Sequence, residues 1–119
     1  MKKASIFFGA FLCVSATVAS ASSQDVRGAY DAALKCFVAN GYLKGTFEKS
    51  GDSANASLFD ARAHKAFDLA FSYGDMLHLS QQQVKADISR TSDPELRKLL
   101  TDGSYLTVIA KDCKYWGMM

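Results

Sequence analysis

The sequence is poor in proline, cysteine, tryptophan and histidine. The part that we expect to fold, residues 22–119, has no excess charge of either sign. Its 119 residues include one Pro, three Cys, one Trp and two His. With 49% hydrophobic and 22% charged residues, this composition excludes disordered and collagen-like chains. The length suits one domain and is too short for a Rossmann unit with a substrate domain or for a barrel enzyme of ordinary size.

The first residues are typical of a cleavable export signal. Its three parts are paired lysines at the start, an apolar stretch over 6–18, and the small-x-small cleavage site Ala19-Ser20-Ala21. The apolar stretch is shorter than the roughly 20 residues of a membrane-spanning helix, and no second one follows, so we expect no stable membrane anchor. The predicted organisation is a signal over 1–21 and a single helical domain over 22–119.

Removal of this signal also removes the apparent basicity of the chain. The sequence has 14 Lys and Arg against 12 Asp and Glu, and two of the lysines lie in the signal, which leaves 12 of each sign. An electrically neutral domain is not expected to bind nucleic acid. Because a short signal with paired lysines is typical of bacteria, we expect a periplasmic or secreted bacterial protein.

Cysteine usage predicts one disulfide. Cys13 lies in the expected signal, so the mature chain has only Cys36 and Cys113, an even pair in an oxidising compartment. The alternative is a pair of metal-binding or redox thiols. Neither cysteine has a second one within four residues, so zinc-finger and thioredoxin spacings are both absent.

Apolar residues recur at intervals of three and four from Asp25 onward, and no segment alternates convincingly with the period of a strand. We therefore expect an all-α fold, a compact bundle of four to five helices stapled by the Cys36–Cys113 disulfide. The expected helices cover 25 to about 43, 54–79, 81–91, a fourth that begins at 93–95, and 104–116. Ser80 and Gln83 form a predicted capping box, with Leu79 and Val84 as its hydrophobic staple.

The segment between the first two expected helices collects Gly, Ser, Thr, Asp and Asn around one aromatic residue. Residues 45–55 are therefore expected to form a long irregular loop, and such loops are often functional. The predicted partner-binding residues are Phe47, Glu48, Lys49 and Asp52, with Phe47 as the anchor. The alternative is that Phe47 folds back and closes the bundle.

Acidic residues and both histidines of the mature chain share one side of the second expected helix. They are Asp60, His64, Asp68, Asp75 and His78. Imidazole and carboxylate pairs are ligands for Zn²⁺ or Cu²⁺. His64 and His78 would lie about 21 Å apart along a straight helix, too far to share one ion. We expect a solvated polar face, with no metal and no cofactor.

No catalytic motif stands out. A Gly-x-Ser-x-Gly elbow, a haem-attachment motif and a phosphate-binding glycine loop are all absent, and both cysteines are expected in the bridge, so we expect a protein that is not an enzyme. The end of the chain concentrates residues that are common in interface anchors. They are Tyr115, Trp116, Met118 and Met119, but we favour the interpretation that Trp116 covers the end of the core while the Met pair frays.

The setting of the two cysteines resembles that of the periplasmic immunity proteins that neutralise type VI secretion amidase effectors. The segments that carry this resemblance are Ala33-Leu34-Lys35-Cys36-Phe37-Val38, late in the first helix, and Lys111-Asp112-Cys113-Lys114-Tyr115, near the end. The resemblance implies a helical protein whose loop plugs the cleft of an effector. Residues 45–55 are the only comparable segment.

Together these features predict a non-enzymatic periplasmic protein that binds another protein, as an immunity or inhibitor protein in the sharpest form. The identity of that partner is open, and so is a homodimer. Two other functions remain: a periplasmic carrier of a metal or small ligand, and an accessory subunit of an envelope or secretion apparatus. Gene neighbourhood separates them, because a toxin gene, a metal-transport operon and a secretion cluster each favour a different one.

Overall fold

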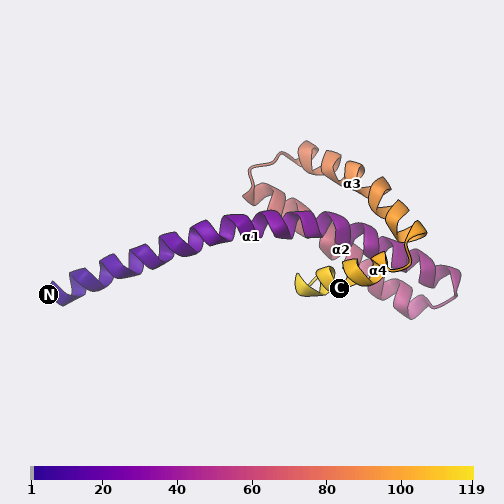
Figure 1. Cartoon of the computed structure of the whole chain (residues 1–119), viewed down its shortest axis with the longest axis horizontal. Helices are drawn as coiled ribbons and strands as arrows, with labels where there is room; N and C mark the ends of the chain where they lie inside the picture. The colour runs from indigo at the N-terminus through magenta and orange to yellow at the C-terminus, as the bar shows by residue number, and fades with distance from the viewer. Residues whose placement is uncertain (1) are drawn as a thin grey trace.

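The computed structural model describes the backbone of residues 2–119 and the side chains of residues 25–119. Over this range the chain is an all-α bundle without strands, which confirms the predicted fold class (Figure 1). The helices are α1 (Lys2–Lys49), α2 (Ser53–Met76), α3 (Gln81–Thr101) and α4 (Tyr105–Tyr115). The expected export signal, residues 1–21, lies outside the part whose side chains are described.

Small residues allow α1 and α2 to pack closely as an antiparallel pair (Figure 1). The side of α2 that is buried contains only alanine and glycine: Ala56, Ala63, Ala66, Ala70 and Gly74. The facing part of α1 buries Ala29, Ala32, Ala33 and Ala39, together with the larger Tyr30 and Leu34. This pair forms the platform on which α3 and α4 lie.

The expected loop over 45–55 is wrong, because α1 continues to Lys49. Only a short turn separates the helices, with Gly51 at a φ of 78° and Asp52 as the cap of α2. Gly41 and Gly45 each destabilise the helix by about 1 kcal/mol relative to alanine. Close packing does not require glycine at either position, because an added Cβ would meet no atom within 4 Å. Packing of α1 along α2 outweighs this cost.

Phe47 therefore lies on a helix, and its ring stacks on that of Phe59 in α2, with centroids 5.5 Å apart. We expect Phe47→Ala to lower the free energy of unfolding by about 1 kcal/mol, since a half-buried aromatic pair is lost. Urea unfolding measures this. Leu58→Ala, at an exposed position of α2, is the control and should change stability by less than about 0.5 kcal/mol. Equal stability of the two variants would contradict the stacking.

The sequence also predicts two helices where the structure has one, because α3 runs through Pro94. Proline removes one backbone donor, so the carbonyl of Arg90 loses the N–H that would bond to it in an uninterrupted helix. Beyond the proline, Glu95 and Leu99 are buried. The packing of these two residues keeps the chain helical through 91–95, where the sequence alone predicts that one helix ends and another begins.

The start of α3 is as predicted. Ser80 Oγ accepts from the backbone N–H of Gln83 at 3.1 Å, and Gln83 Oε1 accepts from the N–H of Ser80 at 2.7 Å, which completes the capping box. Farther along, the Tyr30 hydroxyl donates to the carboxylate of Asp87 at 2.6 Å and links α3 to α1. Within the described chain, no helix has both the length and the hydropathy needed to span a membrane.

Candidate functional site

Helix α4 is fixed to α1 by the disulfide between Cys113 and Cys36, which confirms the predicted pairing. Both cysteines are fully buried, and their Cα atoms lie 5.7 Å apart. The bridge joins positions 77 residues apart in the sequence. It therefore holds the C-terminal helix on the helix that begins the bundle.

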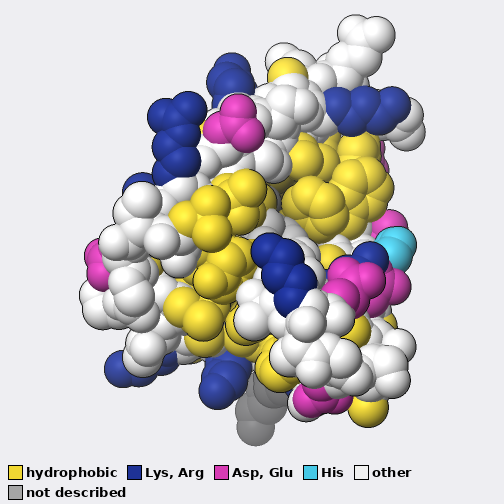
Figure 2. All heavy atoms as spheres, turned by 90° about the vertical axis from the view of Figure 1, so that its right-hand side faces the viewer, with side chains coloured by type: hydrophobic (Ala, Val, Ile, Leu, Met, Phe, Trp, Pro, Cys, Tyr) yellow, Lys and Arg dark blue, Asp and Glu magenta, His cyan; other side chains and the backbone are white. Residues whose placement is uncertain are grey.

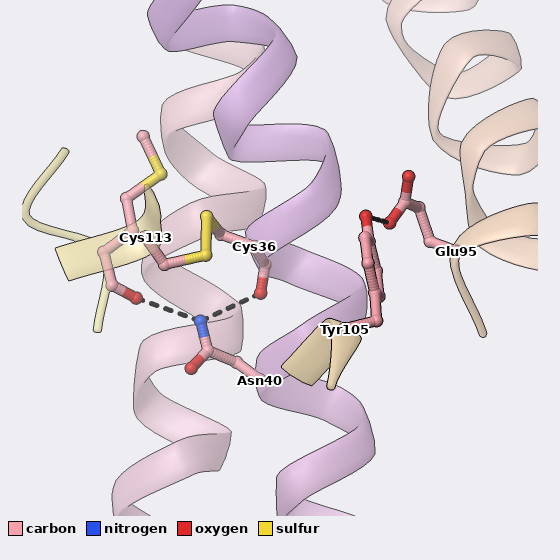
Figure 3. Close-up of a disulfide and its surroundings, with 6 residues drawn as sticks. Cys36, Asn40, Glu95, Tyr105 and Cys113 are labelled. Atoms are coloured by element: carbon pink, nitrogen blue, oxygen red, sulfur yellow. Dashed lines mark hydrogen bonds between the residues drawn. A yellow bond between two sulfur atoms is a disulfide. The ribbon is translucent and has the colours of Figure 1, made fainter. Parts of the chain in front are cut away.

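A buried amide holds the chain that follows α4 (Figure 3). The Nδ2 group of Asn40 donates to the carbonyl of Cys36 at 2.9 Å and to that of Met118 at 3.0 Å. Met118 is buried, so the predicted fraying of the Met pair is wrong for this residue. Trp116 packs on α1 at Gly28, where an added Cβ would lie 3.2 Å from its ring. These contacts leave the end of the chain little freedom.

At its other end α4 is tied to α3 by a hydrogen bond from the Tyr105 hydroxyl to the carboxylate of Glu95 (Figure 3). Partial burial and this acceptor both raise the pKa of Tyr105, so the phenol stays protonated and donates. The ammonium of Lys98 lies 3.6 Å from the same carboxylate. Helix α4 is thus anchored at its start, along its inner side and at its end.

The outer side of this anchored helix exposes large apolar side chains. Val108 is 63% exposed and Tyr115, about two helical turns farther on, is 79% exposed. The Tyr115 ring meets that of Trp116 edge-on at 5.1 Å. A shallow groove of about 420 Å³ runs beside them. We call this surface, made by Tyr105, Val108 and Tyr115, the α4 outer face.

A second hollow lies on the opposite side of α4, where α1, α2 and α4 meet. Its volume is about 660 Å³. The apolar lining is contributed by Leu43, Phe59, Leu106, Ala110 and Met119, and the polar rim by Arg62, Thr107, Lys111 and Lys114. We call this hollow the basic groove. Figure 2 shows the end of the molecule where α1 turns into α2, with exposed hydrophobic side chains and basic ones around and between them.

The four residues predicted to bind a partner do not share a loop. Phe47 packs on α2, while Glu48 and Lys49 are exposed at the end of α1. The carboxylate of Asp52 caps α2 by accepting from the N–H of Asn55 at 3.1 Å, and the hydrogen bonds from Asn55 lower the pKa of Asp52. The cap role of Asp52 was missed because glycine and serine beside it resemble a loop.

The Asp and His residues of α2 do not converge. Asp60 pairs with Lys44 of α1 at 3.0 Å, and the hydrogen bond from Lys44 lowers the pKa of Asp60. His64 Nδ1 lies 3.6 Å from Asp60, and His78 follows α2 with a φ of 61°. Neither Asp68 nor Asp75 joins them, and no three His, Cys, Asp or Glu side chains of the described residues come close enough to hold a metal ion.

Both surfaces of α4 could be found only in part from the sequence. The aromatic and Met residues after Cys113 were recognised as interface-type residues, and Tyr115 is indeed the most exposed large apolar side chain among those described. Val108 and the basic groove were missed. The sequence of α4 does contain apolar residues and two lysines. Which of them share a surface can be assigned only once the buried side of the helix is known.

Comparison with protein-family models, curated proteins and solved structures gave no match, so the function is argued from this geometry alone.

Proposed function

We propose that this chain is a non-enzymatic, exported protein that binds another protein through the α4 outer face. In its sharpest form the proposal is an immunity or inhibitor protein against a secreted effector, located in the periplasm. The observation that carries it is the exposure of Val108 and Tyr115 on a helix held by a disulfide, a buried amide and a tyrosine hydrogen bond.

The physical basis is the cost of leaving such side chains in water. An exposed apolar pair on a rigid element favours association, because little conformational entropy is lost when a partner covers it. Tyrosine is also among the residues that contribute most to binding energy at interfaces. The charged side chains beside this face are Lys35, Lys111 and Asp112, and they would set the orientation of a partner more than its affinity.

This mode of binding differs from the loop insertion that the resemblance to immunity proteins implies. The turn between α1 and α2 is short, and the aromatic residue expected to anchor it packs on Phe59. A helix face would instead cover a groove or a flat surface of the partner. The carrier alternative has less support in the Asp and His stripe, because only Asp60 and His64 come close and no three such side chains of the described residues converge.

We expect the double substitution Val108→Asp and Tyr115→Ala to abolish protection against an effector while leaving stability within about 0.5 kcal/mol, because both side chains are exposed. The assay is survival of cells that make the chain and are challenged with a candidate effector, namely any hydrolase-like toxin that the gene neighbourhood provides. Met76→Ala, an exposed apolar position at the end of α2, is the control and should protect fully. Full protection by the double variant would refute this face as the binding site.

A further inference from the structure

The basic groove shares Lys111 with the rim of the α4 outer face, but protein binding by that face uses neither its apolar lining nor its other two cations, Arg62 and Lys114. Three of its lining residues have cationic side chains, and none has an acidic side chain. Among the described residues, Lys44, Arg90 and Lys98 each pair with a carboxylate. Arg62, Lys111 and Lys114 form no such pair with the side chains that the structure describes.

The three cations come from two helices that the tertiary fold brings together. Arg62 of α2 lies over the ring of Phe59, with its guanidinium carbon 4.9 Å from the ring centroid. Lys111 and Lys114 lie one turn apart on α4. A lysine in the last turn of a helix is favoured by the helix dipole, which accounts for Lys114 alone. The dipole of α4 does not explain why Arg62 of α2, which has no ion pair among the described side chains, lies on the same rim.

Beneath these cations the groove is mostly apolar and is already formed in the free protein. Leu106 and Ala110 of α4 form one wall, while Leu43 and Phe59 extend the lining over α1 and α2. The disulfide fixes α4 against α1, so the walls keep their spacing. A volume of about 660 Å³ lies within the usual range for small-molecule sites.

We propose that the basic groove binds a single-chain anionic amphiphile, specifically a free fatty carboxylate. The carboxylate pairs with Arg62, Lys111 and Lys114, and the alkyl chain covers the apolar lining. Charge complementarity selects this occupant, because a cationic or neutral amphiphile would leave the three cations unpaired next to a hydrocarbon chain.

The test is calorimetric titration of the mature protein with sodium laurate at neutral pH, below the concentration at which laurate forms micelles. We expect one laurate per chain. Dodecyltrimethylammonium, with the same chain length and opposite charge, should bind at least tenfold more weakly, and so should hexanoate, which keeps the carboxylate but has a short chain.

Substitutions separate the groove from general attraction between charges. Lys111→Glu should weaken laurate binding about tenfold or more. Lys85→Glu makes the same change in net charge at an exposed position of α3 and should leave it unchanged. Equal weakening by both variants, equal binding of the cationic amphiphile, uptake of many laurates per chain or no binding at all would each overturn the proposal. So would an acidic protein segment that occupies this groove while laurate does not bind.

Discussion

Replacement of Cys36 or Cys113 by serine is expected to lower the free energy of unfolding by about 4 to 5 kcal/mol. The bridge closes a loop across 77 positions of sequence, and the loss of loop-closure entropy in the unfolded chain grows with the logarithm of that length. A domain of this size is stable by about 5–15 kcal/mol, so the substitution removes a large share of the total. Denaturant unfolding of the mature protein measures the loss.

The two single variants should be destabilised to similar degrees, because each removes the same bridge. The double variant should be no less stable than either single one, apart from small packing effects, since no further bond is lost. Thiol titration of the denatured, unreduced mature protein should find no free thiol. Two reactive thiols, or a large difference between the single variants, would contradict the bridge as a source of stability.

Gly74→Ala is the second substitution with a large expected effect, a destabilisation of about 1 to 3 kcal/mol from overpacking. An added Cβ at this position would lie 2.5 Å from Cγ2 of Val84 and 3.4 Å from the ring of Tyr30. Val84 is buried and β-branched, so its methyl group has little room to rotate away. Helix α3 would have to shift outward. Chemical unfolding of the variant gives the magnitude.

Two further variants separate this clash from a general effect of alanine. Gly41→Ala changes a helical glycine that has open space around it and should raise stability by up to about 1 kcal/mol. In a Val84→Ala background, Gly74→Ala should cost much less, because the clashing methyl group is gone. Destabilisation of equal size in both backgrounds would show that contact with Val84 is not the cause.

Features that depend on local sequence were predictable. The capping box at Ser80 and Gln83 needs only residues a few positions apart, and the chain forms it as expected. The pairing of Cys36 with Cys113 was predictable because they are the only two cysteines in 22–119, the part expected to remain once the predicted export signal is removed. The all-α class follows from the spacing of apolar residues, which α2 and α4 satisfy with small deviations at their ends.

The errors lie where tertiary packing outweighs a local signal. Gly41 and Gly45 favour a helix end, yet α1 continues because its next turns pack on α2. Pro94 favours a helix start, yet α3 passes through it because Glu95 and Leu99 are held inside the bundle. In both places the deciding partner is far away in the sequence, so no local pattern contains it.

The candidate sites were less predictable than the fold for the same reason. Val108 and Lys114 lie on sides of α4 that are distinguished only by what packs against Ile109 and Cys113. Arg62 becomes part of a basic rim only because α2 and α4 border the same groove. These residues can be read from the sequence. The disulfide and the packing of three helices determine which of them share a surface.

Site-specific photo-crosslinking tests whether the α4 outer face binds another protein. Val108 is replaced by a photoreactive phenylalanine derivative, and the protein is irradiated in the cells that make it. The account predicts one adduct with a single protein, lost when Tyr115 is changed to alanine and absent when the same derivative is placed at Gln82, an exposed position of α3. No adduct at Val108, or the same adduct from both positions, would contradict the α4 outer face as the protein-binding surface.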